Sequence, residues 1–119
     1  MRAIVQPAAD RMGLTAAQQQ TVIAILQTAA DRIERVAVFG SRAEGRYRVN
    51  SDLDLVLYGP ADEADCGRLW TLFQDSALPL SVDVKSYDCI AYAPLRAHID
   101  RAAQVWLERV GSALHEIDQ

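Results

Sequence analysis

The sequence predicts a small α/β fold, an α+β domain in which helices pack on a mixed sheet of three or four strands. A length of 119 residues fits one domain with a single modest core, and 50% of the residues are hydrophobic while 24% are charged. A long stretch with helical spacing comes first, and short β-branched runs then alternate with further helical stretches. We expect one domain over residues 1–119, with an N-terminal helix at about 14–35 and the rest of the core at about 36–107.

Thr15 is a suitable N-cap for this first helix, which we expect to run to about Arg35. Its apolar residues recur at helical spacing and form one stripe, which we expect to cover the sheet. These residues are Val22, Ile25, Leu26, Ala29 and Ile33.

Two strands follow the helix. Residues Val36 to Phe39 form a short apolar run that ends at Gly40, and Ser41 to about Arg46 then form a short helix or turn. Residues Leu53 to Tyr58 form the second strand, which the turn signal Gly59-Pro60 ends.

The rest of the chain alternates in the same way. Asp62 is a candidate cap for a helix to about Asp75, and residues Leu80 to Lys85 alternate as a third strand. We expect Leu95 to about Ala103 to be helical, whereas Gln104 to Leu107 fit either a last helical turn or a short edge strand. Aromatic side chains expected in the core are Trp70, Phe73 and Trp106.

The composition excludes several classes of protein. A net charge of −4 argues against a protein that binds nucleic acid by neutralising its phosphates. Cys66 and Cys89 lack metal-ligand spacing and are expected to be buried thiols of a reducing compartment. Residues 1–13 contain no apolar core of signal-peptide length, and no run is long enough to span a membrane. We therefore expect a cytoplasmic protein that does not bind membranes.

Three acidic residues are the candidate metal ligands. Asp52 and Asp54 are two residues apart at the start of a strand, so both side chains are expected on the face opposite Leu53, Leu55 and Leu57. Asp83 points away from the core for the same reason, because Val82 and Val84 point inward. If the third strand lies beside the second, the three carboxylates converge, and Mg²⁺ commonly uses one or two carboxylates together with substrate phosphates.

The Gly40-Ser41 turn is the candidate phosphate site. Gly40 lacks a Cβ atom, so its backbone can bend sharply and approach a phosphate. The start of a helix offers N–H groups to an anion, Ser41 adds a hydroxyl donor, and Arg42 is expected to pair with phosphate oxygens. Such an arrangement suits transfer of a nucleotidyl group.

At these residues the chain resembles the nucleotidyltransferase superfamily with the polymerase-β-type fold. It is most similar to the minimal nucleotidyltransferases, the MntA-like antitoxins that pair with HEPN-domain toxins. The matching residues run from Val36 to Gly45 and from Ser51 to Leu55, followed by Asp83, and Gly-Ser and Asp-x-Asp are separated by ten residues. In members of this family a basic residue often stands at the position of Glu44, and its absence weakens the local positive field.

The resemblance implies roles for these residues. Gly40 and Ser41 would hold the triphosphate of ATP, Asp52 and Asp54 would bind the metal, and Asp83 would bind metal and activate the acceptor hydroxyl. It also implies that the chain moves AMP from ATP to a tyrosine of a partner HEPN toxin, an RNase, and so silences it. Since only 36 residues follow Asp83, we expect the acceptor to come from another chain or from a molecule bound at a subunit interface. A hetero-oligomer with the toxin would provide such an interface.

Two alternatives stay open at this point. The chain could be the nucleotide-binding subunit of a two-subunit small-molecule nucleotidyltransferase, or a module that neutralises a toxin by contact alone. His98 and His115 are interpreted as surface histidines, because neither has a partner at ligand spacing.

Overall fold

The computed structural model describes residues 12–117. The expectation about a signal peptide concerns residues 1–13, most of which lie outside this range. Along the chain the elements are α1 (Ala16–Gln27), the 3₁₀ helix η2 (Ala30–Arg32), β1 (Arg35–Phe39), α2 (Ser41–Glu44), β2 (Leu53–Tyr58), α3 (Glu63–Gln74), β3 (Val82–Ser86), the 3₁₀ helix η3 (Tyr87–Cys89), α4 (Ala93–Ala102), β4 (Gln104–Val110) and β5 (Ala113–Glu116).

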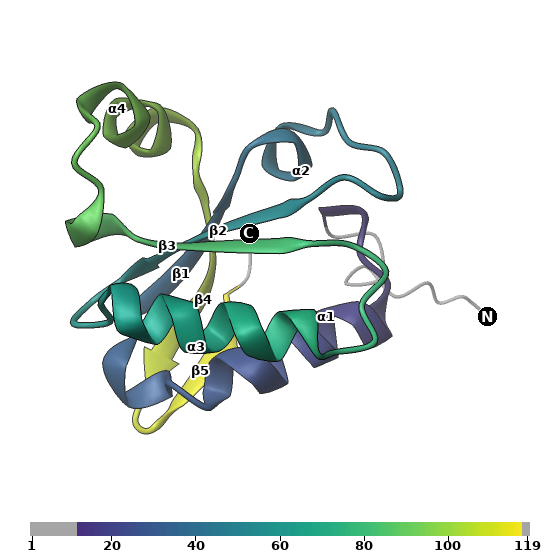
Figure 1. The fold of residues 1–119 in the computed structure, drawn as a ribbon, viewed down its shortest axis with the longest axis horizontal. Coiled ribbons are helices and arrows are strands. Elements are labelled where there is room, and N and C mark those ends of the chain that lie inside the picture. Colours follow the sequence, from purple (N-terminus) through teal and green to yellow (C-terminus); the bar gives the residue numbers. More distant parts are fainter. Residues whose placement is uncertain (1–11, 118–119) are drawn as a thin grey trace.

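The strands form one mixed sheet in the order β3-β2-β1-β4-β5 (Figure 1). β1 pairs antiparallel with both β2 and β4, and β4 pairs antiparallel with β5. β2 and β3 are parallel. The predicted mixed sheet is confirmed, but the predicted count of three or four strands is wrong. Residues 104–107 belong to an inner strand of this sheet, because β4 lies between β1 and β5.

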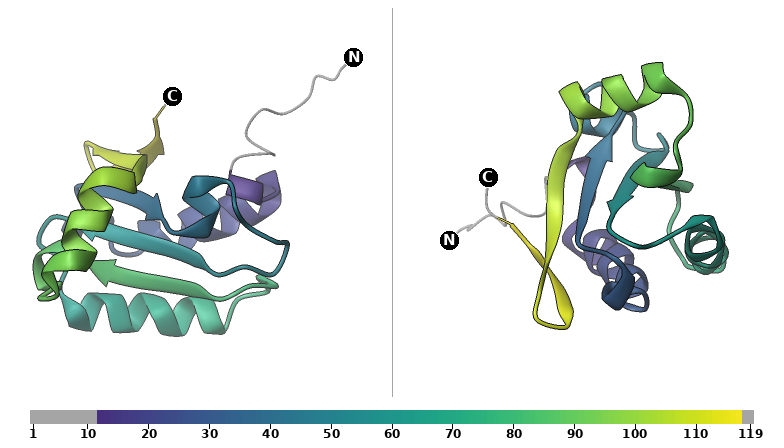
Figure 2. Two further views of the ribbon diagram at one scale, coloured as in Figure 1. Left: turned by 90° about the horizontal axis from the view of Figure 1, so that it is seen from above. Right: turned by 90° about the vertical axis from the view of Figure 1, so that its left-hand side faces the viewer.

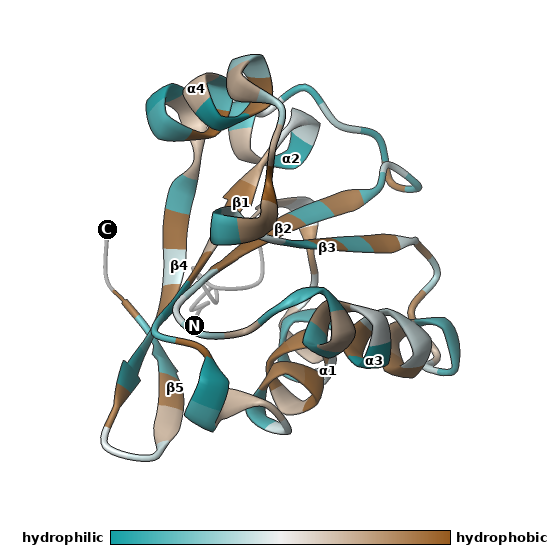
Figure 3. Cartoon of the chain, turned by 60° about the vertical axis from the view of Figure 1, so that its left-hand side comes forward, coloured by the Kyte–Doolittle hydropathy of each residue, from teal (hydrophilic) through white to brown (hydrophobic). Residues whose placement is uncertain are grey.

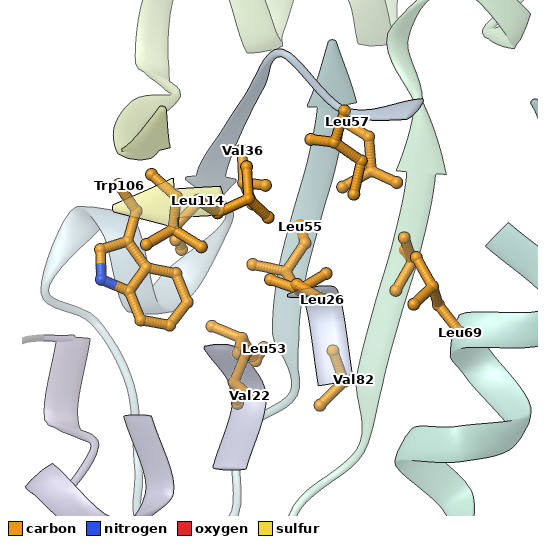
Figure 4. Packing of buried hydrophobic residues seen from close by; sticks show 14 of the residues in the cluster. Val22, Leu26, Val36, Leu53, Leu55, Leu57, Leu69, Val82, Trp106 and Leu114 are labelled. Carbon is orange, nitrogen blue, oxygen red and sulfur yellow. The ribbon is translucent and has the colours of Figure 1, made fainter. Parts of the chain in front are cut away.

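One face of the sheet is covered by α1 and α3, which lie side by side (Figures 1 and 2). Alternation along β2 turns its leucines toward these helices, and α1 contributes Val22 and Leu26 to the same core (Figure 4). The indole of Trp106 is 1% exposed and packs in this core as well. The sequence correctly predicted the leucines of β2 as the anchor of the sheet.

A smaller core lies on the opposite face of the sheet. It contains Ala37, Phe39 and Val56 from the strands, with Ile90 and Ile99 from the segment that includes α4. Figure 3 shows α4 on the side of the sheet away from α1 and α3. Asp54, Val56 and Tyr58 share this face because strand side chains alternate, so Asp54 lies on the less covered side of the sheet.

Both predicted N-caps are present. Thr15 and Asp62 each form a capping box, with Gln18 and Asp65 respectively. The predicted end of the first helix is wrong, however. It ends at Gln27, because Thr28 is its C-cap and Arg35 already belongs to β1, which pairs on both of its sides.

Two predictions about side-chain burial also fail. Trp70 is 50% exposed, because it lies on the side of α3 that faces away from the core residues Leu69 and Phe73. Cys89 is exposed on η3, whereas Cys66 is buried under α3 as expected. Within residues 12–117, none of the helices is long and apolar enough to cross a membrane.

Candidate functional site

Two of the predicted carboxylates lie on neighbouring strands. In the parallel β2–β3 ladder Asp54 is the register partner of Asp83, and paired residues of neighbouring strands share a face. The expectation that the third strand lies beside the second is therefore confirmed. Asp52 is exposed and comes directly before β2, at the same end of the strand.

Electrostatic repulsion is built into this group. Partial burial raises the pKa of Asp54, and the nearby charges of Asp83 and Asp52 raise it further. Lys85 acts in the opposite direction on the pKa of Asp54. The Nζ atom of Lys85 is 3.3 Å from Oδ2 of Asp83, so this cation compensates part of the negative charge. No role was predicted for Lys85, although its position two residues after Asp83 places both side chains on the same face of the strand.

The Gly40 backbone closes one side of the acidic group. Gly40 has a φ of 76° and a ψ of −159°, a conformation that is almost restricted to glycine. A Cβ atom at this position would lie 2.4 Å from Oδ2 of Asp54. The turn therefore approaches the carboxylate more closely than any other residue type would allow.

Ser41 begins α2 directly beside this contact. The N–H of Glu44 donates to the Gly40 carbonyl, which starts the helix. The first N–H groups of a helix have no acceptor within it. Ser41 is half-buried at this position and follows directly on the contact between Gly40 and Asp54. Its role in binding phosphate stays a prediction.

The contacts of the Arg42 side chain differ from those predicted. Its side chain is buried, at 2% exposure, and its guanidinium donates to four backbone carbonyls, those of Met12, Arg48, Val49 and Ser51. Burial lowers its pKa. The expected pairing of Arg42 with phosphate oxygens is corrected accordingly, because its donors hold the loop between α2 and Asp52.

Tyr47 completes this attachment of the loop. The Arg42 guanidinium carbon lies 5.3 Å from the centre of the Tyr47 ring. The same ring fills the space beside Gly13, where a Cβ atom would lie 2.2 Å from the Tyr47 ring carbon Cε1. The loop that carries Asp52 is therefore fixed both to α2 and to the segment before α1.

Glu44 forms local ion pairs on the outer side of α2. Its Oε1 atom is 2.6 Å from Nη2 of Arg46, and its Oε2 atom is 3.5 Å from Nε2 of His98. Arg46 lowers the pKa of Glu44. Arg46 is thus occupied by Glu44, in line with the weaker positive field expected from the sequence.

The residues present suit a hard divalent cation. Asp52, Asp54 and Asp83 offer only oxygen atoms, and the mutual repulsion at Asp54 is what a cation would relieve. Among residues 12–117 no group of three acidic, histidine or cysteine side chains is arranged to enclose a metal by itself. The expected convergence of Asp52, Asp54 and Asp83 on one metal is therefore not seen as a complete ligand set in this part of the chain, and a bound Mg²⁺ would need substrate phosphates and water as further ligands.

Comparison with known proteins agrees with this geometry. The family model described as "Polymerase beta, Nucleotidyltransferase" matches residues 20–110. No curated protein matches the chain.

Two crystal structures share the fold. One is described as a toxin-antitoxin with AMP-PNP, with a TM-score of 0.60 and 21% identity over 73% of this chain and 70% of that chain. Another is described as the toxin-antitoxin MntA-HepT, with a TM-score of 0.52 and 20% identity over 74% of this chain and 70% of that chain.

Replacing Gly40 by alanine should disable the site. The new Cβ atom must displace the Asp54 carboxylate, so we expect Gly40→Ala to weaken binding of Mg²⁺–ATP at least tenfold by isothermal titration calorimetry. Gly45→Ala is the matched control, since Gly45 also has a positive φ of 77° but nothing lies within 4 Å of an added Cβ atom. Equal affinities of the two variants would contradict this assignment.

Replacing Asp54 by asparagine should stabilise the metal-free protein at neutral pH. Because the pKa of Asp54 is raised on folding, the folded chain binds more protons than the unfolded chain in the window above the ordinary carboxyl pKa, and stability falls as pH rises through it. We expect Asp54→Asn to remove this decline and to add about 0.5 kcal/mol at pH 7, a small value because the half-exposed charge is screened. Urea denaturation in EDTA measures it, and a variant less stable than the wild type at pH 7 would refute the explanation.

Replacing Arg42 by lysine should destabilise the fold. Lysine has three donors on one atom and cannot reach four separate carbonyls, so we expect a loss of about 2–3 kcal/mol in urea denaturation. Arg46→Lys is the control, because Arg46 is exposed and pairs only locally with Glu44, and it should change stability by less than about 0.5 kcal/mol. Similar losses in both variants would argue against the anchoring role.

Proposed function

The chain belongs to the polymerase-beta nucleotidyltransferase family, and on this premise we propose that it is an antitoxin that transfers AMP from ATP to a tyrosine hydroxyl of a HEPN-type RNase toxin. The observation that carries the proposal is the position of Asp54, opposite Asp83 and against the Gly40 backbone. Support for the partner comes from two solved structures of the same fold, which are described as toxin-antitoxin complexes.

The proposed reaction assigns one task to each residue. The carboxylate of Asp83 takes the proton from the tyrosine hydroxyl, and the tyrosine oxygen attacks the α-phosphorus of ATP. The bond from that phosphorus to the bridging oxygen of the β-phosphate breaks, and pyrophosphate leaves. Gly40 and Ser41 hold the triphosphate through backbone and hydroxyl donors.

Magnesium is the proposed cofactor. Asp52, Asp54 and Asp83 would hold it, and when bound it supplies positive charge that offsets the charge of the phosphate oxygens. Because ATP and an RNase target are both cytoplasmic, we propose that the protein acts in the cytoplasm, bound to its toxin as a hetero-oligomer and without binding nucleic acid itself.

Incubation with ATP, Mg²⁺ and a HEPN-type toxin tests the proposal. Intact mass spectrometry should show adenylyl groups on a tyrosine of that partner. We expect Asp83→Asn to slow the transfer roughly 10²–10⁴-fold, the usual range for loss of a general base.

The outcomes separate the alternatives. A partner that is silenced without any mass increase, even by the Asp52, Asp54 and Asp83 triple variant, would identify a binding module instead. Transfer of label from ATP to a small molecule only in the presence of a helical partner would identify a two-subunit small-molecule nucleotidyltransferase.

A further inference from the structure

We propose that the acceptor side chain reaches the site from the free edge of β3 and places its apolar part in the cavity between β3, α3 and the segment from η3 to α4. This inference rests on the proposed function and specifies where the acceptor of that reaction binds.

The order of residues across the sheet gives the direction of approach. Gly40 follows β1, Asp54 lies on β2 and Asp83 lies on β3, and these three strands are adjacent in that order. In phosphoryl transfer the attacking and leaving oxygens lie roughly in line. With the triphosphate on the side of Gly40, the attacking oxygen must arrive from the side of Asp83.

Beyond Asp83 the sheet is open. β3 is the last strand of the sheet on this side among residues 12–117, and Figure 1 shows it in front, with α3 below it and α4 above. An acceptor that approaches from this side therefore meets no further strand.

A cavity of about 530 Å³ lies along this edge, within the usual size range of ligand sites. Most of its lining is apolar, and it reaches from α3 around β3 to the start of α4. Its walls include Cys66, Val84, Lys85, Ile90, Tyr92 and Leu95. The apolar members of this wall suit the ring of an aromatic acceptor, and Glu63, Lys85 and Ser86 supply its polar groups.

Lys85 connects the cavity to the carboxylates. Its side chain lines the cavity, and its Nζ atom is 3.3 Å from Oδ2 of Asp83. Both side chains are partly exposed, at 39% and 47%, so an entering hydroxyl group can reach them. A cation at this place favours the deprotonated form of a phenol, which is the form that attacks phosphorus.

A second cavity, of about 380 Å³, is lined by Asp52 together with Gln74, Leu80 and Ser81. Its residues Phe73 and Val82 belong to the core under α1 and α3. The first cavity is also lined by Ile90 and Leu95 from the smaller core on the face that carries Asp54, whereas the second cavity has no lining residue from that core. We therefore do not assign the acceptor to the second cavity.

Cys89 provides a direct test because it is an exposed thiol in the wall of the proposed cavity. Burial raises the pKa of the Cys66 thiol to about 11, so a disulfide reagent reacts selectively with Cys89. A phenol attached to Cys89 through a short disulfide linker should become adenylylated when ATP and Mg²⁺ are added, as measured by intact mass before and after reduction.

The control places the same phenol elsewhere. Val110 is 64% exposed and lies at one end of β4. The other end of this strand, Gln104, pairs with β1 near the Gly40 turn, so Val110 is remote from the site. Val110→Cys in a Cys89→Ser background should accept AMP at least tenfold more slowly, because its tether gives no high local concentration at the site. A tethered phenyl group without hydroxyl should accept none.

The result distinguishes the two proposals. Two outcomes would overturn the proposed acceptor cavity but not the proposed function. One is an equal rate of AMP transfer to the phenol at the two positions. The other is no transfer to the phenol at Cys89 by a chain that does adenylylate its protein partner. A chain that neither binds Mg²⁺–ATP nor modifies any acceptor would overturn the proposed function and this inference together.

Discussion

The close approach of the Gly40 backbone to the Asp54 carboxylate is the constraint on which the site depends. It exists because β1 and β2 are antiparallel, so that Phe39 pairs with Asp54 and the chain must turn at the next residue. Only glycine adopts the required φ and leaves room for the carboxylate. The turn proposed to bind phosphate and the acidic edge proposed to bind metal are therefore one unit, since a change in the strand register would separate them.

The acidic group itself opposes folding, and the surrounding sheet compensates for it. Asp54 is partly buried beside two other carboxylates, which raises its pKa. The leucines of β2 and the helices beneath them bury enough apolar surface to keep the strands paired. Lys85 relieves part of the repulsion, and a bound cation would relieve more. A site that is destabilising without its ligands is a common compromise between stability and activity.

Arg42 explains why the ten residues between Ser41 and Asp52 follow one path. The buried Arg42 guanidinium, at the start of this segment, donates to the carbonyls of Arg48, Val49 and Ser51 near its end and so fixes the path of the loop. Exposed loops of this size have many conformations, and holding one of them costs entropy. Arg42 thus acts on Asp52 through the backbone, and the spacing between Gly-Ser and Asp-x-Asp in this chain matches the length of the loop that Arg42 holds.

The sequence by itself determined the mixed sheet, the caps at Thr15 and Asp62 and the sides of the strands on which the acids lie, because these depend on local periodicity and turn chemistry. It could not give the fifth strand or the exposure of Trp70, since pairing partners and helix orientation come from distant parts of the chain. The same reason explains the wrong prediction for Arg42. A basic residue next to a Gly-Ser turn is expected to bind an anion, and only the folded loop shows that its donors bind backbone carbonyls instead. Only the tertiary structure decided that Asp83 stands opposite Asp54 at an open edge, because parallel pairing joins residues that no local pattern relates.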